Sequence, residues 1–266
     1  MSEREEYSPG VPCWVETLQP DPWAAMNFYR ELFSWDFVAT RGMQGATASY
    51  IAQLRGRDVG AVCPPLNIPN RGARWIKHVR VTSVSDTART ALAAGGQLLI
   101  EPFEVAPGGR MAILSDPAGA TFAVAESSAG RAARLVNESQ AWALSTLRTS
   151  AIKTAEDFYR ALFGWKAQAV GNSGFSIYRL AGYFGGVPFQ PVPRDTVAGM
   201  QLVAAESEPS HWEIDFWVDD VDGTAAHASS LGGIVMVSPQ DTGLFRYAMI
   251  ADPQGAVFTV SKMIGR

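Results

Sequence analysis

Two periodicities alternate along the first part of the chain. A short apolar run, Cys13–Leu18, predicts a strand, and the segment Pro22–Phe33 carries apolar positions at helical spacing. Asp21 is a natural N-cap, and it is followed by a proline at the first helical position. Further short apolar runs predict strands at residues 37–40, 49–54 and 59–63. The first unit is therefore expected to be a strand, a helix and three strands.

The same order of elements returns three times. After a Pro-rich linker at 64–72, we expect a strand at 75–81, a helix at 86–94 that ends at a glycine pair, and strands at 98–101, 111–115 and 121–125. The second half is expected to hold helices at 151–163 and 221–231. Its expected strands are 142–148, 167–170, 175–180, 183–189, 212–218, 234–237, 246–250 and 257–261, with a linker at 188–209.

Two sequence repeats show that the halves are duplicates. Ala25–Trp35 recurs as Ala155–Trp165, and Arg110–Ala120 recurs as Arg246–Ala256. A period of roughly 130 residues is far longer than the 20–50 residues of a solenoid repeat. The sequence therefore predicts two homologous domains, at residues 11–126 and 138–262.

The expected fold class is α+β, with four strand-helix-strand-strand-strand modules that form two duplicated domains with concave mixed sheets. Pairing two modules covers their sheet edges and leaves a cup on the concave side. Candidate functional side chains are therefore expected on the inner faces of the strands.

Composition excludes several classes of partner. The 266-residue chain has a net charge of −4 and no basic stripe, so nucleic acid is not expected. No apolar run reaches 18 residues, so no membrane span is expected, and Met1–Pro9 has no apolar leader core, which favours the cytoplasm. Two cysteines make no disulfide framework. The sequence leaves a monomer and a homodimer equally open.

Two motifs carry a family resemblance. Phe-Tyr-x-x-Leu-Phe-Gly-Trp at the first helix of each half (with Ser34 in place of glycine in the first half), and Asp-Pro-x-Gly-Ala before the last strand, are similar to motifs of the vicinal-oxygen-chelate superfamily of glyoxalases, bleomycin-resistance proteins and dioxygenases. Together with Pro12–Glu16 and the doubled layout, they resemble two-domain glyoxalase-like proteins of actinobacteria. The resemblance implies the fold rather than an activity, since this fold hosts lyases, dioxygenases, epimerases and antibiotic-sequestering proteins.

The resemblance also implies three metal-ligand places in each domain. The middle place falls on Ile76 and Glu213, and the final place falls on Ala123 and Thr259. The first place falls near Trp14 or Glu16 in one half and near Leu144 or Thr146 in the other. Neither half keeps three oxygen, nitrogen or sulfur ligands, so we expect no metal and no cofactor.

The candidate catalytic residues are His78, Glu16 and Arg80. Alternation along the strand puts His78 and Arg80 on the face that carries the ligand place, toward Glu16. They could orient a substrate or exchange protons. The alternative is a partly exposed polar pair at a strand end.

The candidate ligand-binding residues are Trp14, Glu213, Asp215, Trp217 and Tyr247. Glu213 and Asp215 are two positions apart on one strand face, about 7 Å, and could bind a cation or a hydroxyl group, or could be solvated at the cup mouth. The aromatic residues that face the cups would suit a planar or polycyclic molecule.

Two arginines repeat between the halves without an evident chemical role. Arg110 and Arg246 are expected to support the neighbouring Asp-Pro turns.

Three functions remain open. The first is a metal-independent protein that binds a small aromatic or polyketide-like molecule in natural-product metabolism, antibiotic biosynthesis or resistance. The alternative is a metal-free enzyme, such as a lyase, isomerase, cyclase or oxygenase partner. A metal-dependent glyoxalase or dioxygenase would require ligands from other positions.

Overall fold

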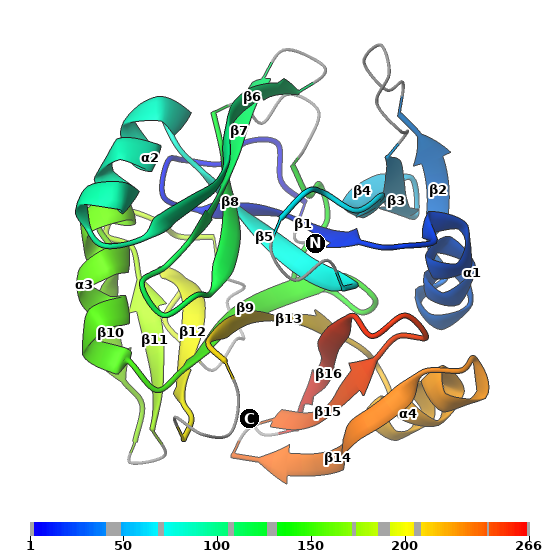
Figure 1. Ribbon diagram of the computed structural model, residues 1–266. Coiled ribbons are helices and arrows are strands. Elements are labelled where there is room, and N and C mark those ends of the chain that lie inside the picture. Colours follow the sequence, from blue (N-terminus) through cyan, green and yellow to red (C-terminus); the bar gives the residue numbers. More distant parts are fainter. Residues whose placement is uncertain are drawn as a thin grey trace.

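Two eight-stranded mixed sheets make up the protein, and four helices pack around them in the part of the chain described by the computed structural model (Figure 1). The described residues are 3–40, 49–68, 72–105, 109–126, 132–171, 174–185, 192–204, 209–243 and 245–264.

The first sheet has the strand order β2-β3-β4-β1-β5-β8-β7-β6. Its strands are β1 (Pro12–Leu18), β2 (Asp36–Ala39), β3 (Tyr50–Leu54), β4 (Arg57–Cys63), β5 (Arg74–Arg80), β6 (Gln97–Val105), β7 (Gly109–Ser115) and β8 (Thr121–Ala125). The two modules join where β1 and β5 run antiparallel, and each of these strands is parallel to one strand of its own module, β4 or β8.

The second sheet repeats this order as β10-β11-β12-β9-β13-β16-β15-β14. Its strands are β9 (Trp142–Thr149), β10 (Lys166–Ala169), β11 (Phe175–Arg179), β12 (Thr196–Leu202), β13 (His211–Trp217), β14 (Ile234–Thr242), β15 (Phe245–Ala251) and β16 (Val257–Met263). The identical topology confirms the predicted α+β fold of two duplicated halves.

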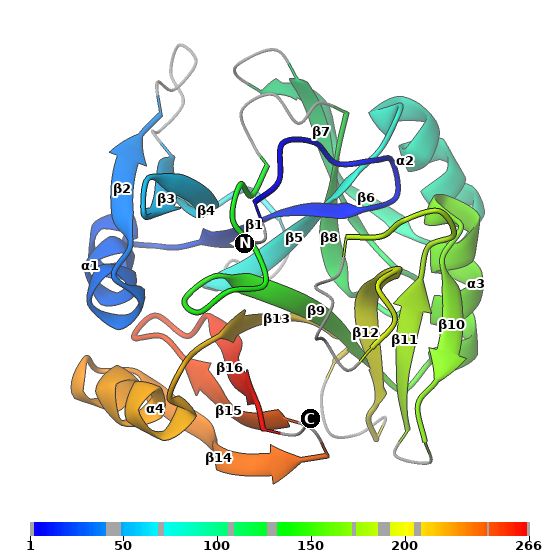
Figure 2. The same cartoon turned by 180° about the vertical axis from the view of Figure 1, so that it is seen from behind.

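The helices are α1 (Pro22–Phe33), α2 (Val84–Ala93), α3 (Ile152–Phe163) and α4 (Val221–Ser230). The carboxylate of Asp21 caps α1 by accepting from two backbone N–H groups of the first turn, as its sequence predicts. Helices pair between the halves, α1 with α4 and α2 with α3, on opposite flanks of the molecule (Figures 1 and 2). None of the helices within the described ranges is long and apolar enough to cross a bilayer.

The two sheets pack back to back. The floor of each cup is a pair of central strands, β1 with β5 and β9 with β13, and the cups open on opposite sides of the molecule (Figure 1). Aromatic rings fill the space between the sheets; Trp75 on β5, for example, meets Phe216 on β13 with ring centroids 5.0 Å apart. Trp35 and Trp165, which follow the C-terminal ends of α1 and α3, are both almost fully buried. Most of the aromatic residues are therefore core.

Reciprocal hydrogen bonds join the halves. The Tyr29 hydroxyl on α1 donates to Asp252 Oδ2 of the second half at 2.8 Å, and the Tyr159 hydroxyl on α3 donates to Asp116 Oδ2 of the first half at 3.2 Å. Both aspartates belong to the Asp-Pro-x-Gly turns, where their other oxygen accepts from two backbone N–H groups. The two repeated motifs therefore meet across the interface between the halves. We call the two hydrogen-bonded contacts, Tyr29 with Asp252 and Tyr159 with Asp116, the Tyr–Asp pairs.

One lysine is sealed into this interface. Lys77 is fully buried, its ammonium nitrogen lies 3.2 Å from the ring centroid of Trp212 and 4.7 Å from that of Trp165, and it has no hydrogen-bond partner among the described residues. Burial holds the pKa of Lys77 well below its usual range.

Two sequence expectations were wrong. The fourth strand of the third module is Thr196–Leu202, inside the expected linker, whereas residues 183–185 form no strand and 186–189 lie outside the described residues. Tyr183 lies outside any strand, and its apolar ring packs against the hydrophobic core, which explains the apolar pattern at this position. The repeated arginines do not hold the Asp-Pro turns, because Arg110 contacts Glu104 and Ser85, and Arg246 binds Asp222 and Asp241.

Candidate functional site

The first cup is floored by side chains from β1, β5 and β8. The register pairs Trp14 with His78 and Glu16 with Ile76 across the antiparallel strands, and it pairs His78 with Ala123 on β8. Because directly paired residues project to the same face, these five residues share the concave side. Strand alternation therefore predicted the neighbours on this floor.

Glu16 and His78 lie together in this cup. Glu16 Oε1 is 3.3 Å from His78 Nε2, and the Cys63 thiol donates to Glu16 Oε2 at 3.5 Å. Neither ring nitrogen of His78, nor Trp14 Nε1, has a hydrogen-bond partner within the described ranges. Arg80 does not join this cluster, because its guanidinium donates to the backbone carbonyls at the strand end.

The first cup is closed. Trp14, Glu16 and His78 are each at most 1% exposed, and the apolar linker residues Leu66 and Ile68 pack against the same core cluster. On another side, the N-terminal segment and the link between the halves run together beside β1, joined by a hydrogen bond from Tyr7 to the Ala133 carbonyl (Figure 2). The protein fills this cup with its own side chains.

The second cup differs because its floor is polar and partly exposed. Thr259 Oγ1 donates to Glu213 Oε1 at 2.6 Å, and Ser261 Oγ donates to Asp215 Oδ2 at 2.7 Å. Thr146 is in register with Glu213 from β9 and faces the same side. Two acidic side chains from β13 are thus each held by a hydroxyl from β16.

The carboxyl group of Asp215 on this floor has a raised pKa. Burial raises its pKa to about 7, with a further increase from the neighbouring Glu213, and the Ser261 hydrogen bond opposes both effects. Part of the residue is exposed, yet its Oδ1 atom is buried and has no hydrogen-bond partner among the described residues. The burial that matters for the pKa is that of the carboxyl group rather than of the whole side chain.

Arg148 on β9 completes the polar set and was missed at the level of sequence. Its Nη1 atom lies 3.6 Å from Glu213 Oε2, and its side chain is 25% exposed. The signal was available in principle, because Arg148 follows Thr146 by two positions on the same strand face. Finding it requires the β9–β13 register, which the sequence left undecided.

Aromatic residues lie at the borders of the second cup. Tyr247 is in register with Ser261 and is partly exposed, with its hydroxyl accepting from Gln240. Trp217 is also paired with Ser261 and is partly exposed, and it reaches the junction between the halves. On the opposite wall, the Phe175 ring covers the Gly199 backbone closely enough that a Cβ there would lie 3.0 Å from it.

The residues at the family's metal-ligand places do not fit a metal ion. The first cup offers Glu16, Ile76 and Ala123, of which one is a ligand type. The second offers Thr146, Glu213 and Thr259, and the single carboxylate is already engaged by a hydroxyl and a guanidinium. Within the described ranges, no three His, Cys, Asp or Glu side chains form a metal-binding group.

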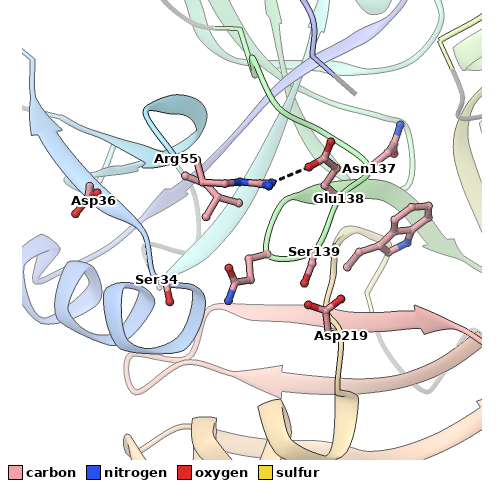
Figure 3. A pocket seen from close by; sticks show the side chains of 10 residues that line it. Ser34, Asp36, Arg55, Asn137, Glu138, Ser139 and Asp219 are labelled. Atoms are coloured by element: carbon pink, nitrogen blue, oxygen red, sulfur yellow. Dashed lines mark hydrogen bonds and ion pairs between the residues drawn. The ribbon is translucent and has the colours of Figure 1, made fainter. Parts of the chain in front are cut away.

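A separate hollow of about 720 Å³ lies at the junction of the halves, between the end of α1, the β3–β4 turn and the link that precedes β9 (Figure 3). Its lining residues are Ser34, Asp36, Leu54, Arg55, Asn137, Glu138, Ser139, Gln140, Trp217 and Asp219. Arg55 reaches across it to Glu138 at 2.7 Å, and the Arg55 side chain is 62% exposed. The exposed Arg55 side chain shows that this hollow is open to the surface.

The fold and the two ligand-place sets define the class: a duplicated glyoxalase-like protein. Residues 14–125 and 145–261 each match the glyoxalase-like domain family, and the chain belongs to this family. It is therefore a two-domain member of the vicinal-oxygen-chelate superfamily.

Two relatives match along almost the whole chain. CFP32 of Mycobacterium tuberculosis (strain CDC 1551 / Oshkosh), which is named as a glyoxylase, is 32% identical over 269 residues, covering 98% of both chains. The anthracycline biosynthesis protein DnrV of Streptomyces peucetius is 30% identical over 273 residues, covering 97% of this chain and 94% of DnrV.

Solved structures share the fold at low identity. The Mn(II)-bound glyoxalase from Novosphingobium aromaticivorans aligns with a TM-score of 0.64 and 14% identity, covering 97% of this chain and 84% of that one. The 2,3-dioxygenase LapB from Pseudomonas sp. KL28 aligns with a TM-score of 0.62 and 13% identity, covering 98% and 94%.

Proposed function

We propose that this protein binds a small aromatic or polyketide-like molecule in the second cup, without a metal ion, as part of natural-product metabolism or resistance. The observation that carries the proposal is the contrast between the cups. Glu16 and His78 are sealed beneath the protein's own side chains, whereas Glu213 and Asp215 remain partly exposed on a polar floor.

The chemistry of the second cup suits such a ligand. A small-molecule site typically combines apolar and aromatic walls with a few well-placed polar groups. Tyr247, Trp217 and Phe175 supply aromatic surface, while Arg148 and Asp215 supply polar contacts. The name of the relative DnrV, an anthracycline biosynthesis protein, agrees with a polycyclic aromatic ligand.

A calorimetric titration with the planar tricyclic compound 9,10-anthraquinone tests this proposal. Loss of stacking and of buried area should weaken binding to Trp217→Ala about tenfold or more. Arg55→Ala is the control, because it alters the junction hollow that Trp217 also borders, and it should bind like the wild type. EDTA should leave the affinity unchanged. The proposal fails if Trp217→Ala binds normally, or if affinity disappears with EDTA.

A second candidate function is that of a metal-free enzyme that uses the first cup. It is favoured by the contact between Glu16 Oε1 and His78 Nε2 at 3.3 Å, which pairs a carboxyl group with an imidazole that could exchange protons with it, and by the unpartnered Nδ1 atom of His78. In this candidate Arg80 holds the strand end, since it binds backbone carbonyls rather than Glu16. Turnover of an aromatic substrate that His78→Ala abolishes would favour the enzyme, whereas binding without turnover that His78→Ala leaves unchanged would favour the binding protein.

A further inference from the structure

Asp215 has one satisfied and one unsatisfied oxygen. Oδ2 accepts the hydrogen bond from Ser261, whereas Oδ1 is buried on the floor of the second cup with no partner among the described residues. A buried polar atom without a hydrogen bond costs folding free energy. The unpaired Oδ1 atom therefore indicates that water or a ligand supplies its missing hydrogen bond. This oxygen is therefore the point at which a bound molecule would meet the floor.

The surrounding charges decide which form of the carboxyl group meets the ligand. On this face the titratable and charged neighbours are His211 and Glu213 on β13, Arg148 on β9 and Tyr247 on β15, while β16 contributes only hydroxyls. Arg148 lies beside Glu213, 3.6 Å away, and no cation contact to Asp215 is found in the described part of the chain. Because Arg148 can neutralise only one of the two adjacent carboxyl groups, the arrangement favours a proton on the carboxyl group that lacks a cation, that of Asp215.

We infer that Asp215 keeps its proton on Oδ1 and donates it to a carbonyl oxygen of the ligand, so that the second cup selects aromatic ketones and quinones over hydrocarbons of the same shape. This inference rests on the proposed function and specifies its ligand class. The Ser261 hydrogen bond fixes Oδ2 and thereby aims Oδ1 into the cup. Burial raises the pKa of Asp215 to about 7, which agrees with a neutral donor in slightly acidic solution.

The test compares 9,10-anthraquinone with anthracene, a hydrocarbon of the same outline, by calorimetry between pH 6 and 8. Wild-type affinity for anthraquinone should fall about tenfold over this interval, following the protonated fraction of a group with a pKa of about 7, and affinity for anthracene should not change with pH. Asp215→Asn keeps an N–H donor in place, so it should bind anthraquinone within about threefold of the wild type at pH 6 and lose the pH dependence.

Asp215→Leu provides the complementary variant, with similar size and no donor. It should lose the preference for anthraquinone and keep the affinity for anthracene. A flat wild-type pH profile, or an Asp215→Asn variant that loses the preference as Asp215→Leu does, overturns the inference while leaving the proposed function in place. Failure of both compounds to bind overturns the proposed function and the inference with it.

Discussion

His78 and Asp215 occupy matching places in the two cups, but their surroundings give them different roles. Each is in register with the final ligand place of its own half, Ala123 or Thr259. His78 is fully buried beside Glu16, while Asp215 is partly exposed, with Oδ2 hydrogen-bonded to Ser261 and Oδ1 buried without a partner among the described residues. The duplication therefore preserved the backbone and changed the chemistry of single positions.

Burial of Lys77 lowers the stability of the folded protein. The Trp212 ring face favours the ammonium form by roughly 2 kcal/mol, but removing a charge from water costs several kcal/mol, so burial prevails and lowers the pKa. The native state thus binds fewer protons than the unfolded chain, whose lysine stays protonated up to about pH 10.4. Stability should therefore rise with pH.

Substitution of Lys77 by Met should remove this rise. One proton contributes at most about 1.4 kcal/mol per pH unit, between the lowered pKa and the ordinary one. We expect Lys77→Met to be more stable than the wild type at pH 7, with the difference shrinking toward pH 10, in urea titrations. Lys166→Met, at an exposed site, is the control and should follow the wild type. A stability difference that stays constant with pH would contradict a neutral Lys77.

At the scale of elements, the Tyr–Asp pairs tie helices of one half to turns of the other. Asp252 accepts from Tyr29 and Gln19 through Oδ2 and from the backbone of Gln254 and Ala256 through Oδ1. Because hydrogen bonds to charged groups contribute about 1.5–3 kcal/mol each, this one side chain stabilises both a turn and an interface. The recurrence of both motifs in each half has a structural reason.

Variants of these pairs should destabilise to different extents. Tyr29→Phe removes one hydrogen bond to Asp252 and should cost about 1–3 kcal/mol, whereas Asp252→Ala removes the acceptor of four hydrogen bonds and should cost more. Urea denaturation with matched Tyr159→Phe checks this order, and that variant should cost less because its bond is longer, 3.2 Å. If Asp252→Ala is no worse than Tyr29→Phe, the aspartate has no central role.

The elements themselves were largely predictable from local patterns. Helix α1 begins where Asp21 and Pro22 place it, and each Asp-Pro-x-Gly turn has its glycine in the left-handed region, at φ 98° for Gly119 and φ 95° for Gly255. Strand β12 was not predictable, because the prolines that precede Thr196–Leu202 are typical of a linker, and the aromatic segment before them is a better match to a strand.

The candidate site was predictable only in part. Strand alternation placed Glu213 and Asp215 on the cup face and brought Glu16 toward His78. The depth of burial was not predictable, because it depends on residues outside the strands, such as Ile68 of the linker between β4 and β5, that join the same core cluster. The same limit applies to Arg148, since its contact with Glu213 depends on the register between two strands more than 60 residues apart.

At the scale of the whole molecule, two similar cups open in opposite directions from a shared aromatic interior (Figure 1). The shared interior makes each half part of the other's core, since Phe33 of α1 packs on Phe216 and Phe258 of the second half. One cup can then be closed for structure while the other stays open for a ligand, which is the central claim of the proposed function.

Fluorine NMR of protein labelled with 5-fluorotryptophan tests this claim most directly. The chain has eight tryptophans, and Trp14 lies on the floor of the first cup while Trp217 borders the second. Trp14→Phe and Trp217→Phe assign the two signals. On titration with 9,10-anthraquinone, the Trp217 signal should shift in a saturable manner and the Trp14 signal should stay in place. A saturable shift of Trp14 with Trp217 unchanged would place the ligand in the first cup and contradict the account.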